Sequence, residues 1–236
     1  MGRVKNFNPE ADNNKAVTAH VVPFVAWIFL MHMLGDPSGM TYAIRTAMCV
    51  LLFLFLRPWR WYPSLNIRNL PLAFVVGVIV FVVWVFPESP WMPEALRNFY
   101  MKYLMLPFFK MPEPLTEFVY APEVCGWPLS LVRLAGSAFV IAIIEEFFWR
   151  GFLYRWMLGH NFLEVDHGKM SVAMLFLVSL VFGFEHARWL AGILAGLAYG
   201  WLYIKTRDIW AASVAHVVTN LLLGEYVLAT GSYVFW

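Results

Sequence analysis

Three short groups of ionisable and polar residues lie within otherwise apolar sequence, and their types suit acid–base chemistry. They are Glu145-Glu146-x-x-x-Arg150, Phe182-x-x-x-His186 and His216-x-x-x-Asn220. Ionisable side chains in membrane-spanning segments are energetically expensive, so they are by default a hypothesis for a functional site. Together the three groups supply carboxylates for a general base, imidazoles that carry protons and an amide that donates hydrogen bonds. This inventory suits hydrolysis.

Helical spacing separates the roles within the first group. Glu146 and Arg150 are four residues apart, so they share a helix face and can form an ion pair. Glu145 is rotated by about 100° from Glu146 and has no partner at that spacing. An unpaired carboxylate in a medium of low dielectric can serve as a general base near neutral pH. The alternative is an ion pair at the membrane surface that marks a helix end, with Glu145 solvated.

The second and third groups each place their two residues on one helix face. His186 shares a face with Phe182. The alternative is that His186 lies at a helix end and is hydrated at the membrane interface. His216 and Asn220 have long apolar flanks, which favours their burial. The small residues just before them (Ala211, Ala212, Ser213 and Ala215) let a neighbouring helix approach closely. The alternative for this group is a polar contact that holds two helices together.

Composition places the chain in a bilayer. Of its 236 residues, 61% are hydrophobic and 14% are charged, whereas a soluble domain carries roughly 25% charged residues. The net charge of +2 and the lack of a basic stripe with aromatics argue against a nucleic-acid partner. Cys49 lies in an apolar run and Cys125 in a loop, so they predict no disulfide framework. No local motif ties a histidine to either cysteine, which argues against a nucleophilic thiol.

Apolar stretches long enough to cross a bilayer predict an all-α polytopic transmembrane helix bundle. We expect seven spans, at Val17–Leu34, Met40–Leu56, Leu70–Phe86, Leu129–Leu158, Met170–His186, Leu190–Ile204 and Ile209–Leu228. The proline-rich segment 87–128 would make eight if it contributed one, and its centre, Ala95–Phe109, predicts an amphipathic interfacial helix. Residues 1–128 hold the N-terminal helices and this loop, and residues 129–236 hold the three groups. Both parts form one continuous membrane domain.

Lysine and arginine residues alternate between successive loops, which predicts a cytoplasmic N-terminus and an outside C-terminus. The polar N-terminal tail precedes an apolar stretch without a convincing cleavage site, so the first helix is expected to stay uncleaved and to act as the insertion signal. We expect four further histidines to be interfacial: His20, His32, His160 and His167. The aromatic residues Phe147, Phe148 and Trp149 are expected to face lipid or the core.

In their order along the chain, the three groups resemble the CAAX protease and bacteriocin-processing family of intramembrane endopeptidases. The family pattern is Glu-Glu-x-x-x-Arg, then Phe-x-x-x-His, then His-x-x-x-Asn or a close variant, and the resemblance covers roughly Leu129 to Leu223. The stretch Phe182–Trp189 is similar to the exosortase-associated subgroup, although Glu185 stands where an apolar residue is usual. Short loops and small size suggest a prokaryotic cytoplasmic membrane.

The resemblance implies an enzyme that hydrolyses a peptide bond of a membrane-associated protein or peptide. Glu145, helped by His186, would deprotonate a water molecule that attacks the peptide carbonyl. His216 and Asn220 would donate to the oxyanion, a role in which losing one donor can lower the rate on the order of 10²–10³-fold. The glutamate–arginine pair of the first group would fix the helix. No cofactor is expected; the alternative is a zinc ion bound by one glutamate and two histidines, with an open water position.

Two other functions would use the same residues. A non-catalytic immunity or scaffold protein would bind a peptide in the same cavity. A proton-coupled transporter would use the buried carboxylate and imidazoles as a relay, but the chain shows no repeated halves or matching broken helices. One geometric condition applies to all three functions. His186 lies at the far end of its expected span, so convergence with Glu145 and His216 needs a cavity open toward the membrane face or a helix that runs past His186.

Overall fold

The computed structural model describes residues 9–105 and 118–236, and within these ranges every regular element is a helix. The α-helices are α1 (Pro9–Met33), α2 (Gly39–Leu56), α3 (Leu70–Val85), α4 (Glu94–Tyr103), α5 (Pro122–Cys125), α6 (Trp127–Ala135), α7 (Ala142–Glu146), α8 (Arg155–Leu158), α9 (Val172–Phe184), α10 (Trp189–Thr206) and α11 (Ile209–Thr230). The expected all-α polytopic class is confirmed.

Seven membrane spans were expected, and fewer helices of the described chain are long and apolar enough to cross a membrane. Five helical stretches of the described chain are long and apolar enough to cross a membrane: Asp12–Met33, Gly39–Trp61, Ile67–Glu88, Trp127–Leu158 and Ile209–Thr230. The other two expected spans are present as α9 and α10. α9 has 13 residues and is too short for a full crossing, and α10 is not among the five. No spanning helix lies in the described part of residues 87–128.

The longest stretch, Trp127–Leu158, is interrupted twice by π-helical turns. These are Gly136–Ile141 and Phe147–Tyr154, and they flank the short α7 that carries Glu145 and Glu146. The wider π-helical turn shifts the side chains around the axis relative to an α-helix, and such turns occur frequently at functional sites. Glu145 and Glu146 therefore lie on a short α-helical segment that has a π-helical segment on each side.

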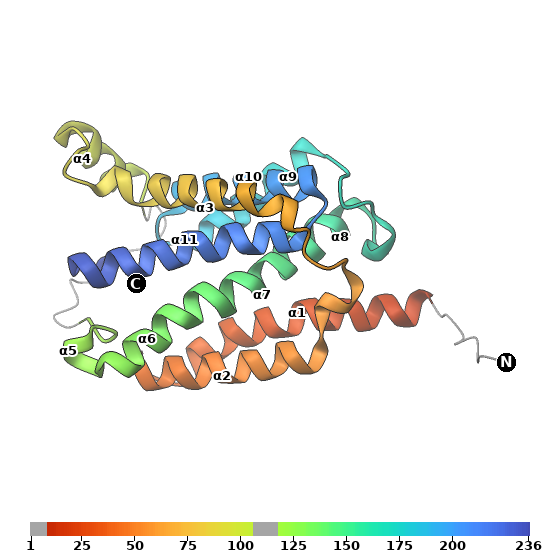
Figure 1. The fold of residues 1–236 in the computed structure, drawn as a ribbon, viewed down its shortest axis with the longest axis horizontal. Coiled ribbons are helices and arrows are strands. Elements are labelled where there is room, and N and C mark those ends of the chain that lie inside the picture. The colour runs from red at the N-terminus through yellow and green to blue at the C-terminus, as the bar shows by residue number, and fades with distance from the viewer. Residues whose placement is uncertain (1–8, 106–117) are drawn as a thin grey trace.

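The helices form a bundle with the Trp127–Leu158 stretch at its centre (Figure 1). The α1–α2 pair packs on one side of this stretch and α11 on the other. α3 packs against α11, and α9 packs against α10. Glycine permits the closest approaches: a Cβ added at Gly77 of α3 would lie 2.5 Å from the Ala215 carbonyl oxygen of α11. Small residues at helix interfaces are the usual means of such packing in membranes.

Side-chain caps define the first residues of α9 and α11, the two helices that carry the second and third sequence groups. The Ser171 side chain accepts a hydrogen bond from the backbone N–H of Met174 at the start of α9. Asp208 accepts one from the Trp210 N–H at the start of α11, and its other oxygen accepts from the Asn69 side chain over 3.0 Å. N-terminal caps of this kind satisfy otherwise orphaned donors. Asp208 therefore also ties the start of α11 to the loop before α3.

One expected interfacial residue is part of the core instead. His20 is buried, its Nδ1–H donates to the Ala16 carbonyl over 2.6 Å, and its Nε2 lies 2.9 Å from the Tyr62 hydroxyl. Its position near the end of the apolar run suggested an interface, but α1 continues for eleven residues before it. The helix expected within Ala95–Phe109 is present as α4, which exposes Leu96 and Phe99, and its position at the membrane interface stays a prediction; the part beyond residue 105 lies outside the described residues.

Candidate active site

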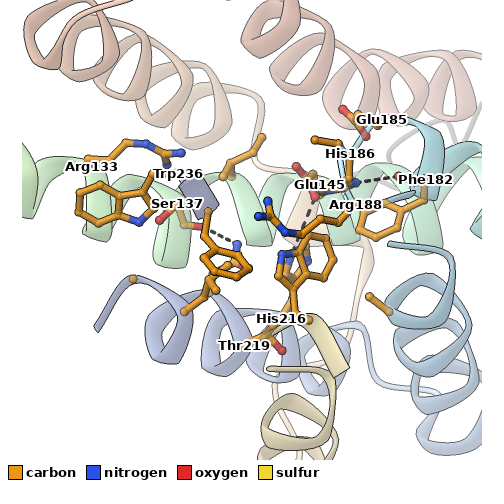
Figure 2. Close-up of a pocket in the computed structure, with 18 of the residues that line it drawn as sticks. Arg133, Ser137, Glu145, Phe182, Glu185, His186, Arg188, His216, Thr219 and Trp236 are labelled. Carbon is orange, nitrogen blue, oxygen red and sulfur yellow. Dashed lines mark hydrogen bonds and ion pairs between the residues drawn. The ribbon is translucent and has the colours of Figure 1, made fainter. Parts of the chain in front are cut away.

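All three sequence groups meet at one cavity of about 540 Å³ (Figure 2). Glu145 enters it from α7, Phe182 from α9 and His186 from the turn after α9. His216 and Asn220 enter it from α11. The cavity therefore collects every residue to which the sequence assigned a direct role in hydrolysis.

The short length of α9 removes the geometric difficulty with His186. A helix of thirteen residues rises roughly 20 Å, which is less than the hydrocarbon thickness of about 30 Å. The end of α9 consequently lies inside the bundle beside α11, with the Phe182 ring centroid 6.0 Å from that of His216. His186 follows immediately and lines the same cavity as Glu145.

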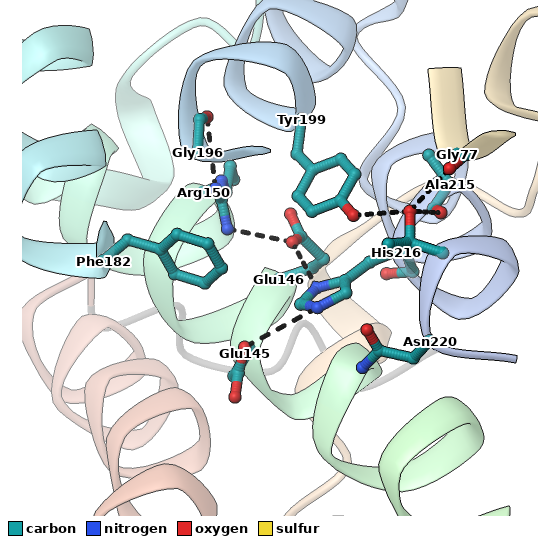
Figure 3. A network of polar contacts seen from close by, with 12 residues as sticks. Gly77, Glu145, Glu146, Arg150, Phe182, Gly196, Tyr199, Ala215, His216 and Asn220 are labelled. Atoms are coloured by element: carbon teal, nitrogen blue, oxygen red, sulfur yellow. Dashed lines mark hydrogen bonds and ion pairs between the residues drawn. The ribbon is translucent and has the colours of Figure 1, made fainter. Parts of the chain in front are cut away.

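Glu146 is the hub of a buried polar network behind the cavity (Figure 3). Its Oε1 accepts a hydrogen bond from Arg150 Nη1 over 2.9 Å, which confirms the predicted pairing on one helix face. The same oxygen accepts from the Nδ1–H of His216, also over 2.9 Å. Arg150 Nη2 donates to the Gly196 carbonyl oxygen of α10 over 3.2 Å. One carboxylate thus connects α7 to α11 directly and to α10 through the guanidinium.

This network sets the direction of the His216 ring. Because Nδ1 carries the proton donated to Glu146, Nε2 is the nitrogen that faces the cavity, 3.9 Å from Glu145 Oε2. That distance is longer than a direct hydrogen bond, and a single water molecule with two legs of about 2.8 Å can bridge it. Glu145, which had no partner at helical spacing, has an imidazole partner on another helix.

The cluster of Glu145, Glu146 and Arg150 carries a net charge of −1 when all three are ionised, so one further proton is needed to neutralise it. The carboxylate of Glu185, which lines the same cavity, adds a further negative charge when it is ionised. Unbalanced charge is costly in a buried site, and Glu146 and Arg150 are 0% and 2% exposed. A proton on His216 Nε2, or on Glu145 opposite it, makes the cluster neutral. The Glu145–His216 pair is therefore a place where a proton is held and can be moved.

His186 is fixed by its own helix. Its Nδ1–H donates to the Phe182 carbonyl over 2.8 Å, so Nε2 is left as a lone-pair acceptor in the neutral ring. Of the two cavity histidines in the described chain, His216 is the one within ion-pair distance of Glu145.

The remaining predicted residues shape the site. Asn220 Nδ2 donates to the Ser137 carbonyl over 2.9 Å, which orients the amide and leaves its second hydrogen for another acceptor. The Phe182 ring is buried and lies 4.5 Å from the Arg150 guanidinium carbon. Its aromatic face contributes a cation–π contact to the buried arginine.

Sequence reasoning missed Tyr199, which supports the site from α10. Its ring stacks on His216 with centroids 4.7 Å apart and planes inclined by 22°. Its hydroxyl donates to Thr219 Oγ1 over 2.7 Å, and Thr219 Oγ1 donates to the Gly77 carbonyl over 2.9 Å. No local pattern identifies Tyr199 as a site residue, because an aromatic residue in an apolar helix is predicted to be a core residue.

Two cavity-lining arginines, Arg45 and Arg133, were also missed as site residues. A signal for them existed, because both are ionisable residues inside apolar runs, and the rule that selected Glu145 applies equally to them.

The described residues offer no ready metal site: no group of three or more His, Cys, Asp or Glu side chains within residues 9–105 and 118–236 is arranged to hold a metal ion. The hydrogen bonds of His216 Nδ1 to Glu146 and of His186 Nδ1 to a backbone carbonyl leave Nε2 of both rings unbound, which is how zinc-bound histidines are usually oriented. The Glu-His-His zinc alternative therefore stays a prediction.

Comparison with known proteins gives one match. Residues 127–222 match the family model described as type II CAAX prenyl endopeptidase Rce1-like. No curated protein and no solved structure matches the chain. The matched segment begins with α6, contains all three sequence groups and ends within α11. The match bears on the family and not on the exosortase-associated subgroup, which stays a prediction.

Proposed function

We propose that the protein is an intramembrane endopeptidase that hydrolyses a peptide bond of a membrane-associated protein or peptide, because residues 127–222 match the family model of Rce1-like type II CAAX prenyl endopeptidases. The observation that carries this proposal is the approach of Glu145 Oε2 to His216 Nε2, 3.9 Å apart on the wall of the cavity. A base and a proton donor at this separation suit hydrolysis by an activated water.

In the proposed reaction, the Glu145 carboxylate takes one proton from a water molecule as the water oxygen attacks the peptide carbonyl carbon. The neutral His186 accepts the second water hydrogen at Nε2 and orients the lone pair for attack. Its fixed Nδ1–H bond to Phe182 supports this role, because it leaves Nε2 as the only acceptor on that ring.

His216 in its protonated form donates from Nε2 to the developing oxyanion, and Asn220 donates its free amide hydrogen. Glu146 stabilises the charged imidazole through the bond to Nδ1. Preorganised donors of this kind are usually the largest contribution to stabilising such an intermediate.

The tetrahedral intermediate collapses when the proton held by Glu145 passes to the leaving nitrogen and the carbon–nitrogen bond breaks. Glu145 returns to its ionised form, and the products are a carboxylic acid and an amine, between which a proton then passes to give a carboxylate and an ammonium group. Water supplies all the atoms added, so no covalent intermediate with the protein is required.

The test compares the wild-type protein with Glu145→Gln, both purified in detergent and matched in melting temperature. Each is incubated with a library of membrane-tethered C-terminal peptides, prenylated and unprenylated, and products are read by mass spectrometry. The matched control is Glu225→Gln, which changes an exposed carboxylate of α11 outside the cavity. A chelator is added in a parallel series.

Cleavage by wild type and Glu225→Gln that is lost in Glu145→Gln supports the proposal, and persistence with chelator supports the metal-independent mechanism. Cleavage that survives in Glu145→Gln contradicts the role of Glu145. Peptide binding without cleavage by any of the three proteins would instead favour a non-catalytic binding or immunity protein.

A further inference from the structure

The end of the cavity that holds Glu145 carries another carboxylate, which the proposed reaction does not use. Glu185 lines the cavity from the turn between α9 and α10, immediately before His186. Figure 2 shows Glu185, His186 and Glu145 in one group, with Arg133 and Trp236 at the other end of the residues drawn. Glu185 is exposed, whereas Glu145 is 8% exposed. A molecule that enters the cavity beside Glu145 can therefore reach the Glu185 carboxylate.

The local structure gives no reason for a carboxylate at position 185. Glu185 is the C-cap residue of α9, where the helix dipole favours cations and not anions. The start of α10 has no side-chain cap that Glu185 could explain. Glu185 forms no ion pair within the described residues. The Trp149 indole N–H interacts with its carboxylate and supplies a donor without net charge. The negative charge of Glu185 thus has no neighbouring cation to balance it.

Two buried arginines close to this end of the cavity are already bound to other groups. Arg150 donates to Glu146 and to a backbone carbonyl. Arg188 forms two hydrogen bonds with Glu88 and a third with a backbone carbonyl. Neither guanidinium is therefore available to pair with Glu185.

Negative charge exceeds positive charge at this end of the cavity. Glu145 and Glu185 lie close enough for their charges to repel each other. Arg150 balances one carboxylate, that of Glu146, and a protonated His216 would balance a second. One negative charge still remains when all three carboxylates are ionised. Unbalanced charge is costly in a partly desolvated cavity, so the site attracts a cation.

We propose that Glu185 binds a cationic side chain of the peptide substrate, a lysine or an arginine close to the bond that is cleaved. This inference rests on the proposed peptidase function and names a class of substrate for the same site. An ammonium or guanidinium group forms charge-assisted hydrogen bonds with a carboxylate. The cation would also weaken the repulsion between Glu185 and Glu145, which favours the ionised Glu145 that accepts a proton from water.

The position of Glu185 limits where in the peptide the cation lies. Glu185 directly precedes His186, which orients the attacking water in the proposed reaction. An extended peptide advances about 3.3–3.6 Å per residue, so a long side chain within about two residues of the reacting carbonyl can reach this wall of the cavity. A cationic residue much farther along the peptide would lie outside this end of the cavity.

The test measures binding, so that it does not depend on cleavage. The full chain with Glu145→Gln is immobilised in a neutral detergent; on this background Glu185 is the unpaired carboxylate at this end of the cavity. It is exposed to N-palmitoyl peptides that differ at one position, which holds lysine, Nε-acetyl-lysine, norleucine or glutamate. Acetyl-lysine keeps the length of lysine and removes its charge. The variable residue is moved along the peptide, and retained peptides are quantified by mass spectrometry.

We expect the lysine peptide to be retained on the order of tenfold more strongly than the acetyl-lysine peptide, as for hydrogen bonds between charged groups. This preference should be confined to one or two neighbouring positions of the peptide. Glu185→Gln on the same background should remove it, and Glu185→Lys should shift it to the glutamate peptide. The control Glu225→Gln should preserve it, because this exposed carboxylate of α11 does not line the cavity.

Equal retention of the lysine and acetyl-lysine peptides at every position overturns the inference. A lysine preference of the same size at all positions also overturns it, because general attraction to a negative surface would produce that result, as does a preference that survives Glu185→Gln. The lysine and acetyl-lysine comparison keeps residue 185 unchanged, so it decides the question even if the Glu185 variants fail to fold.

Binding and cleavage together separate this inference from the proposed function. A positional lysine preference without any cleavage by the wild-type protein contradicts the peptidase and keeps the cation subsite. Cleavage of the same peptides by the wild-type protein without a lysine preference contradicts the subsite and keeps the peptidase.

Discussion

His216 on α11 and Glu146 on α7 are joined by a buried hydrogen bond of 2.9 Å, from the imidazole Nδ1–H to the carboxylate Oε1. That oxygen is also the acceptor for Arg150. The helix-internal ion pair and the contact between helices therefore share one atom. Loss of the carboxylate affects both the stability of the bundle and the orientation of a cavity imidazole.

A double-mutant cycle separates these two effects. Glu146→Gln and Arg150→Gln should each lower the free energy of unfolding by about 3–5 kcal/mol, because each leaves a buried charge without its partner. The double variant should lose less than the sum, since no unpaired charge remains. Denaturant titration in detergent measures this. Activity should stay low in the double variant, because His216 still lacks its carboxylate; recovery of cleavage together with stability would contradict the orienting role.

Tyr199 makes two contacts, a hydrogen bond and a ring stack, and different substitutions remove them one at a time. Tyr199→Phe removes the hydrogen bond to Thr219 and should lower the free energy of unfolding by about 0.6 kcal/mol, the average for such bonds between membrane helices. It keeps the ring stacked on His216, so cleavage should change by a factor of about two or less. Tyr199→Leu removes the stack and should slow cleavage on the order of tenfold or more. Equal rates for both variants would show that the ring does not position His216.

The Arg188–Glu88 pair fixes the turn that carries His186. Both side chains are largely buried, and Arg188 Nη2 donates to Glu88 Oε2 over 2.9 Å. Glu88→Gln should lower kcat on the order of tenfold with a smaller change in KM, because the displaced group orients water rather than binding peptide. The control Glu94→Gln, at an exposed carboxylate of α4, should be neutral. A change confined to KM would place this pair in substrate binding.

The class of fold and the residue types of the site could both be predicted from the amino-acid sequence. Long apolar runs must form helices in a bilayer, because every backbone donor and acceptor has to be satisfied within the segment. The Glu146–Arg150 pairing was predictable because residues four apart share a helix face wherever the helix lies in the bundle. The burial of His216 followed from its long apolar flanks for the same local reason.

The way in which these groups come together depends on the packing of the helices. The contact of His216 with Glu146 joins residues seventy positions apart, and it depends on how α7 and α11 are rotated against each other, which packing sets. The early end of α9 brings His186 to the cavity, although the apolar pattern alone suggested a longer helix. His20 is buried because a distant loop supplies Tyr62 as its partner. Arg45 and Arg133 face a common cavity only because α2 and α6 are neighbours. No periodicity along one chain segment encodes that proximity.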